Sequence, residues 1–142
     1  MFDIKLLRDT TYKPHKAFDG DAGFDVFYDG TEPIKLYPKE HVKIPLGFAI
    51  ELPAGYVALI QAKSGLAGNF GLTTIGNVID STYRGECHAI LLNTSDKLVI
   101  IDSGDKIAQM LVIPCYTKCE YTIVDKLSFT VRGEGGFGST GK

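Results

Sequence analysis

Two segments in the first half of the chain combine charged side chains with glycine, as binding sites for phosphorylated ligands often do. Asp21–Asp25 (DAGFD) places two carboxylates around a predicted turn that leads into a strand. Ala62–Ala67 (AKSGLA) supplies a cation, a hydroxyl group and a glycine N–H at the predicted beginning of a helix. The first N–H groups of a helix lack intrahelical acceptors and attract anions. The second segment therefore predicts an anion-binding loop.

Two further segments add an acid, an aromatic ring and an amide. Gly76–Gly85 (GNVIDSTYRG) predicts a short hairpin, with Asp80 at one end and Tyr83 three residues later. A carboxylate within hydrogen-bond reach of a water molecule can act as a general base. Ser103–Gln109 (SGDKIAQ) predicts a turn that leads into a strand. Taken singly, each segment also fits an ordinary structural role, such as a turn cap, a solvated helix beginning or a packing tyrosine.

The last part of the chain, Gly133–Gly141 (GEGGFGSTG), has five glycines among nine residues. One interpretation is a frayed terminus, where order is usually lowest. However, flexible linkers avoid large aromatic residues, and Phe137 lies in the middle of this segment. A segment with one ring, two hydroxyl groups and many accessible N–H groups can close over a planar, phosphorylated ligand.

Together and in this order, the five segments resemble the motifs of the trimeric deoxyuridine triphosphatase (dUTPase) family, from Asp21 to Gly141. The resemblance implies a jelly-roll homotrimer with sites at the subunit boundaries. It implies hydrolysis of dUTP to dUMP and pyrophosphate by attack of water on the α-phosphate, with Mg²⁺ on the triphosphate. This reaction limits uracil in DNA and supplies dUMP for thymidylate synthesis.

The resemblance also implies a role for each matching residue. Asp80 matches the catalytic acid that activates water, and Asp25 matches an acid held near the metal through water, with no direct protein ligands expected. Tyr83 matches the ring under the deoxyribose. Phe137 matches the ring that stacks on uracil. The positions that match substrate-binding residues are Lys63, Ser64, Gly65, Thr74, Val78, Ile79, Tyr83, Gln109, Arg132, Phe137, Gly138, Ser139 and Thr140. Lys63 and Lys106 stand where the family usually has arginine.

Composition limits the other possibilities. The chain has 142 residues, 44% of them hydrophobic, which fits one globular domain with a real core. A net charge of −2 argues against a surface for long nucleic acid. We find no apolar run long enough to span a membrane and no signal segment, so the expected location is the cytoplasm. The three cysteines match no zinc spacing and are expected to be reduced and mostly buried.

Frequent glycine and proline residues predict about ten short strands and an all-β, jelly-roll-like barrel or sandwich. One short helix is expected around 64–69. We expect a β core over 1–125 and a flexible, glycine-rich C-terminal arm over 126–142 that closes over an active site. Predicted strands are Ile4–Leu7, Phe24–Tyr28, Ile34–Tyr37, Phe48–Leu52, Tyr56–Gln61, His88–Asn93, Leu98–Asp102 and Lys106–Ile113, with Tyr121–Val124 also β-favouring.

The sequence leaves four other functions to distinguish from this one. A dCTP deaminase shares the fold and the trimer but does not need the stacking tail, and a bifunctional deaminase–triphosphatase is a variant of it. A nucleotide sensor that binds a regulatory protein partner would hydrolyse slowly, so turnover separates it from an enzyme. A purely structural β-sandwich has no use for the glycine-rich tail.

Overall fold

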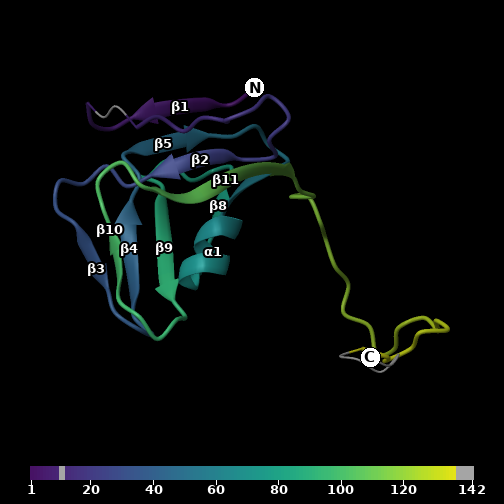
Figure 1. Ribbon diagram of the computed structural model, residues 1–142. Helices are drawn as coiled ribbons and strands as arrows, with labels where there is room; N and C mark the ends of the chain where they lie inside the picture. The colour runs from purple at the N-terminus through teal and green to yellow at the C-terminus, as the bar shows by residue number, and fades with distance from the viewer. Residues whose placement is uncertain (10–11, 137–142) are drawn as a thin grey trace.

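The computed structural model describes residues 1–9 and 12–136. Within these residues, eleven strands and one short helix form a body from which the last part of the chain departs (Figure 1). Four residues expected to bind substrate, Phe137, Gly138, Ser139 and Thr140, lie outside the described residues. The elements are β1 (Asp3–Leu6), β2 (Phe24–Phe27), β3 (Ile34–Leu36), β4 (His41–Pro45), β5 (Phe48–Glu51), β6 (Tyr56–Gln61), α1 (Ser64–Phe70), β7 (Leu72–Thr74), β8 (Val78–Asp80), β9 (His88–Asn93), β10 (Val99–Ile101) and β11 (Lys106–Pro114).

All the strand pairs are antiparallel, and the strands are grouped into four small sheets. The largest sheet has the order β2-β11-β6-β8, and a second sheet has the order β4-β9-β7. Two pairs, β1-β5 and β10-β3, complete the body. The prediction of an all-β, jelly-roll-like fold with one short helix is confirmed.

Alternating burial builds the core. In β6, Ala58 and Ile60 point inward, and in β9 Ala89 and Leu91 do the same. This is the period of two that a half-buried strand imposes. Phe48, which is 1% exposed, is among the largest side chains of this core. The strands that carry the predicted site residues are therefore held in place because their other face packs in the hydrophobic core.

The segment predicted as a hairpin between Gly76 and Gly85 has a different structure. β8 pairs with β6 instead of with a strand formed by residues 81–85, and β7 belongs to another sheet. Gly76 has a positive φ of 59°, a conformation that glycine adopts without steric cost. The chain turns there from one sheet to the other, which a hairpin pattern in the sequence does not reveal.

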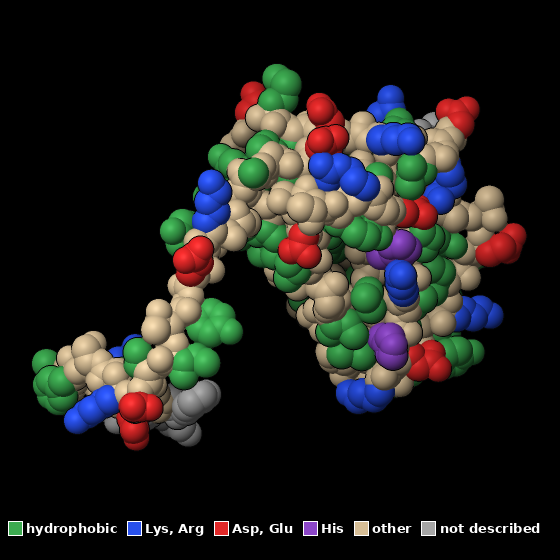
Figure 2. All heavy atoms as spheres, turned by 180° about the vertical axis from the view of Figure 1, so that it is seen from behind, with side chains coloured by type: hydrophobic (Ala, Val, Ile, Leu, Met, Phe, Trp, Pro, Cys, Tyr) green, Lys and Arg blue, Asp and Glu red, His purple; other side chains and the backbone are tan. Residues whose placement is uncertain are grey.

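After Pro114 the chain leaves the body, and Figure 1 shows it running outward as an extended arm. Tyr121–Val124, predicted to favour a strand, forms none here. Strands need a partner for their backbone N–H and C=O groups, and within the described residues this segment has none from its own chain. Hydrophobic side chains are visible on the arm (Figure 2), and Tyr121 and Ile123 are each 87% exposed.

The cysteines are all free, but only Cys87 is buried, while Cys115 is half-buried and Cys119 is exposed. The expectation that most of them are buried was therefore wrong, because Cys119 lies on the arm beyond the core. Burial raises the pKa of the Cys87 thiol to about 12. Across residues 1–9 and 12–136, no helix is long and apolar enough to cross a membrane.

Candidate functional site

One group of predicted site residues lies where β2, β11 and β6 meet. Gln109 on β11 is opposite Asp25 of β2 on one side and Gln61 of β6 on the other. Its side-chain amide donates to the carbonyl of Ala62, 3.2 Å away, just before the helix. A Cβ at Gly23 would lie 3.2 Å from the Gln109 side-chain oxygen, so glycine leaves room for this amide. Gln109 thus joins the beginning of β2 to the loop before α1.

Asp25 is the centre of this group. Its carboxylate accepts hydrogen bonds from the ammonium groups of Lys63 and Lys106, the latter at 2.9 Å. Burial alone would raise the pKa of Asp25, but the two lysines outweigh burial and hold the pKa below its ordinary value. Lys63 and Lys106, which stand where the resemblance predicts arginine, thus bind the same buried carboxylate. Because its pKa is lowered, Asp25 is ionised at neutral pH.

The helix α1 begins at Ser64, with Gly65 as its second residue and Lys63 as its extended N-cap. Both Ser64 and Gly65 are exposed, and no atom lies within 4 Å of a Cβ built at Gly65. Its first N–H groups precede the first intrahelical hydrogen bond, from the Ala67 N–H to the Lys63 carbonyl at 2.9 Å. Free donors, a hydroxyl and a cation thus occur together, as the sequence predicts for an anion-binding loop.

A second group lies on β8, at the edge of the four-stranded sheet. Val78 is opposite Leu59, and Asp80 is opposite Val57 near the beginning of β6. Ile79 faces the core and is 8% exposed, whereas Val78 is 61% exposed. Because β8 pairs only with β6, its other edge keeps backbone N–H and C=O groups unpaired by any described strand.

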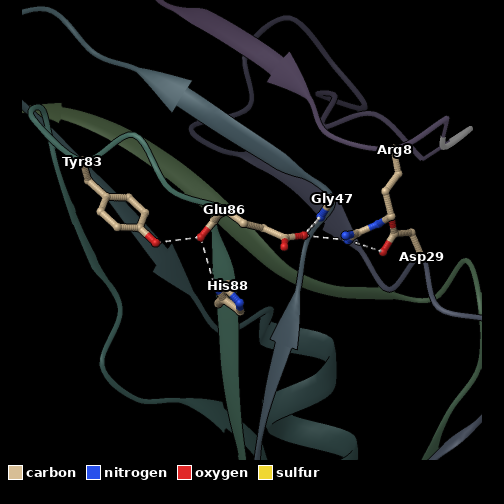
Figure 3. A network of polar contacts seen from close by, with 6 residues as sticks. All are labelled: Arg8, Asp29, Gly47, Tyr83, Glu86 and His88. Carbon is tan, nitrogen blue, oxygen red and sulfur yellow. Dashed lines mark hydrogen bonds and ion pairs between the residues drawn. The ribbon is translucent and has the colours of Figure 1, made fainter.

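A cavity of about 220 Å³ opens beside β8. Val78, Ile79, Asp80 and Tyr83 line it, together with His88. The hydroxyl of Tyr83 donates to the carbonyl of Glu86 at 3.1 Å, which fixes the far end of the ring (Figure 3). An acid, an aromatic ring and an unpaired strand edge therefore surround one hollow.

The two groups lie far apart within one chain. Asp80 is level with Val57, whereas Ser64 begins α1 beyond the other end of β6. A strand rises about 3.3 Å per residue, so seven residues separate the two by roughly 20 Å. The structure brings Asp25, Lys63, Ser64 and Gln109 together at one end of β6, and brings Val78 to Tyr83 together at the other.

Two predicted site residues belong to neither group. Thr74 ends β7, opposite Leu91 of β9, and lies just before the turn at Gly76. Arg132 lies on the arm, where its Nε donates to the carbonyl of Gly135 at 2.8 Å. No cluster of three or more histidine, cysteine, aspartate or glutamate side chains suited to a metal occurs within residues 1–9 and 12–136.

Comparison with known proteins decides the family. The sequence pattern of dUTPases matches residues 9–141. The chain belongs to the dUTPase family. It is 44% identical over 140 residues to the deoxyuridine 5'-triphosphate nucleotidohydrolase of Hydrogenobaculum sp., covering 97% of this chain and 96% of the relative. The resemblance inferred from the five motifs is confirmed.

Solved dUTPase structures have the same fold. The dUTPase of Staphylococcus bacteriophage 80alpha with dUPNHPP superimposes with a TM-score of 0.86 at 26% identity, covering 100% of this chain and 99% of that one. A mutant dUTPase from phage phi11 of S. aureus, described with a structural Mg(II) ion, has a TM-score of 0.77 at 25% identity, with coverage of 91% and 99%.

Three residues at or beside this site, Lys106, Arg8 and Glu86, were not predicted as site residues. Lys106 was predicted only as a departure from arginine, and its place within the Ser103–Gln109 motif was the signal that could have identified it. Arg8 and Glu86 form an ion pair at 2.6 Å although 78 residues separate them, and neither belongs to a recognised motif. Contacts of this kind depend on the folded topology.

Proposed function

We propose that this dUTPase hydrolyses dUTP to dUMP and pyrophosphate at sites built from the two groups on different copies of the chain. The single observation that carries the proposal is the hollow beside β8, in which Asp80 and Tyr83 face the same space. Hydrolysis of dUTP by the dUTPase family limits uracil in DNA and supplies dUMP for thymidylate synthesis.

The uridine part of the substrate fits the β8 group. Uracil presents one donor between two acceptors, and the unpaired edge of Val78–Asp80 offers backbone groups that can pair with such an edge. Thr74 lies just before the turn that leads to this strand. The Tyr83 ring lies under the deoxyribose and leaves no space for a 2′-hydroxyl group, so UTP does not bind productively.

Asp80 acts as the general base. Its carboxylate is exposed at the end of β8 and lines the hollow, where a water molecule can reach it. The carboxylate takes a proton as the water oxygen forms a bond to the α-phosphorus. The bond from the α-phosphorus to the bridging oxygen breaks, and pyrophosphate leaves with the electron pair.

The triphosphate fits the group at the other end of β6. Ser64 and Gly65 offer a hydroxyl and free N–H groups, and the Gln109 amide lies behind the same loop. Lys63 is bonded to Asp25, so it contributes a fixed positive charge instead of the bidentate contact of an arginine. These donors, rather than a strongly basic surface, balance the charge of the ligand.

The described residues also fit Mg²⁺ carried on the triphosphate. Mg²⁺ keeps several water molecules and binds phosphates plus one or two carboxylates, so it needs no protein cage. Asp25, held ionised by two lysines, suits contact with the ion through water. When bound, Mg²⁺ neutralises negative charge on the pyrophosphate. Asp25 would hold the hydrated ion, while Ser64 and Gly65 hold the phosphate oxygens.

The separation of roughly 20 Å along β6 supports a site shared between chains, because one phosphate cannot touch both ends of that strand. The arm supports a homotrimer of the family type. Its apolar residues alternate with polar ones and are exposed in the single chain, as in a strand that pairs with another copy; they are Tyr121, Ile123, Leu127, Phe129 and Val131. The arm carries Arg132, which is proposed to bind the γ-phosphate together with Ser139 and Thr140, and Phe137, which is proposed to stack on the uracil ring.

The experiment that tests this function is pyrophosphate release from dUTP, dCTP, dTTP and UTP, each with Mg²⁺ and with EDTA. We expect fast release from dUTP alone and loss of most activity with EDTA. Release from dTTP or UTP at similar rates would contradict the proposed reading of base and sugar. Ammonia production from dCTP would indicate a deaminase, and very slow turnover with tight binding would indicate a sensor.

A further inference from the structure

Glu86 connects the sugar-facing tyrosine to the opposite side of the body. Its backbone carbonyl accepts a hydrogen bond from the Tyr83 hydroxyl at 3.1 Å and contacts Nδ1 of His88 at 2.8 Å. A carbonyl only accepts, so the second contact places a proton on Nδ1. Its carboxylate points the other way and accepts from the Gly47 N–H at 2.9 Å. Figure 3 shows Glu86 between the tyrosine and the Gly47 turn.

Arg8, just beyond β1, holds the carboxylate side of Glu86. Its Nη2 donates to Glu86 at 2.6 Å, and its Nε donates to Asp29 at 3.1 Å. The Asp29 side chain is 5% exposed and therefore shielded from water, whereas that of Glu86 is 24% exposed and only partly shielded. Burial would raise the pKa of Glu86, but the Arg8 and Gly47 hydrogen bonds outweigh it and lower this pKa. The carboxylate therefore stays charged and keeps its partners.

The segment between Asp80 and Glu86 has few other anchors. It forms no strand, and its backbone contact is the Tyr83 N–H to the Asp80 carbonyl at 3.1 Å. The Arg84 side chain bonds to the Ser81 carbonyl of its own segment and to the exposed Glu51 at 3.0 Å. A side chain at Gly85 would collide with the Tyr83 ring, so the ring packs directly over this backbone. The position of the ring thus depends on where Glu86 is held.

We propose that Arg8 and Glu86 are positioning residues that set the discrimination between deoxyribose and ribose by fixing Tyr83. The inference rests on the proposed function, in which the ring excludes a 2′-hydroxyl. Exclusion of one hydroxyl group by a ring requires that the ring stay in place, since a displacement of about 1 Å changes how a substrate fits. Glu86 itself lines the hollow beside β8. Its carboxylate contacts with Arg8 and Gly47 supply that rigidity from the side that faces away from Tyr83.

The test compares kcat/KM for dUTP and UTP in the intact protein and in the variants Arg8→Gln and Glu86→Gln. We expect each variant to lower the dUTP/UTP selectivity by about tenfold, the effect of losing about 1.4 kcal/mol of discrimination. The loss should occur mainly through a higher KM for dUTP and a gain in UTP hydrolysis, with kcat for dUTP less affected. A general loss of folded protein would lower both substrates equally and leave the ratio unchanged.

Glu51→Gln is the matched control. It removes the Arg84–Glu51 ion pair, which anchors the same segment but does not lead to the Tyr83 hydroxyl. Its selectivity should equal that of the unmodified protein. The double variant Arg8→Gln/Glu86→Gln should be no less selective than either single variant, because Arg8 acts through Glu86.

Unchanged selectivity in both single variants, or an equal loss in Glu51→Gln, would overturn the inference. If Arg8→Gln unfolds below the assay temperature, Glu86→Gln decides, because its amide oxygen still accepts from the Gly47 N–H. The unmodified protein is assayed in the same series. Failure of that protein to hydrolyse dUTP would refute the proposed function, whereas unaltered variants of an active, selective enzyme would refute only the positioning role.

Discussion

The ammonium group of Lys63 donates a hydrogen bond to the carboxylate of Asp25, and this contact ties the residue before α1 to the strand β2. Lys106 approaches the same carboxylate from β11. The loop proposed to bind phosphates is therefore held against the body by one buried acid. Removal of that acid should weaken the fold in a way that depends on pH.

Replacement of Asp25 by asparagine should lower the free energy of unfolding by about 1–3 kcal/mol at neutral pH, because two lysines lose their acceptor. The folded-state pKa of Asp25 is lowered, so its stabilising contribution is present above the unfolded-state pKa and is lost as the pH falls through the folded-state value. The difference between the two proteins should therefore shrink below about pH 4.

Thermal unfolding from pH 7 down to pH 3 measures this difference. Asp19→Asn is the control, because Asp19 is an exposed carboxylate with no ion pair to another described residue. A difference between Asp25→Asn and the unmodified protein that stayed constant over the whole range would contradict the role assigned to this ion pair.

Alanine variants at Gly65 and Gly68 of α1 can distinguish an effect on substrate binding from an effect on helix stability. A Cβ meets nothing within 4 Å at either Gly65 or Gly68, so alanine fits at both positions. Each change to alanine should stabilise the helix by about 0.5–1 kcal/mol. Only Gly65→Ala places a methyl group where phosphate is proposed to bind, and it should lower kcat/KM for dUTP by about 10–100-fold.

Steady-state kinetics and thermal unfolding of the two alanine variants check this pair. Gly68→Ala should keep the activity of the unmodified protein. Equal activity in both variants would show that the beginning of α1 does not contact the substrate.

The last part of the arm, from Arg132 onward, should be dispensable for folding and assembly but required for catalysis. Among residues 1–9 and 12–136 the last strand ends at Pro114, and Arg132 is exposed. A chain that ends at Val131 should keep the unfolding midpoint and the assembly state of the full chain, measured by thermal unfolding and light scattering. Its dUTP hydrolysis should be severely reduced. Loss of folding or assembly in this shortened chain would make the end of the arm a structural element instead.

Much of the fold could be predicted because the signals are local. The segment rich in isoleucine and leucine before a turn predicted β9 with its bounds, His88–Asn93, and the AKSGLA segment marked the beginning of α1. β4 (His41–Pro45) was not predicted, although Val42 and Ile44 alternate with polar neighbours. The proline at its end weakens the strand signal, because proline cannot donate a hydrogen bond to a neighbouring strand. β7 has three residues, and its pairing with β9 decides its conformation.

The site was predicted in its parts but not in its arrangement. Motifs identified Asp80, Tyr83 and Ser64, yet nothing in their spacing shows that β6 separates them. The placement of Lys63 and Lys106 on one carboxylate, and of Arg8 on Glu86, likewise comes from strands that are distant in sequence and adjacent in the sheets. Side-chain contacts of this kind follow from topology, which a single sequence encodes only indirectly.

If each site combines Asp80 of one copy with the α1 loop of another, two inactive proteins should restore activity when they assemble together. Asp80→Asn removes the general base and should lower kcat by about 10²–10⁴-fold while dUTP still binds. Gly65→Asp places a carboxylate at the phosphate loop and should prevent dUTP binding by charge repulsion. Each variant alone should be nearly inactive and correctly assembled.

The two variants are unfolded together, refolded as an equal mixture, and assayed for pyrophosphate release from dUTP. If the sites are shared, random assembly gives about a quarter of them an intact Asp80 and an intact Gly65, so about a quarter of the normal activity should return. Separately refolded variants combined afterwards serve as the control and should stay inactive. No recovery in the co-refolded mixture would show that one chain builds the whole site, and would contradict a site shared between copies.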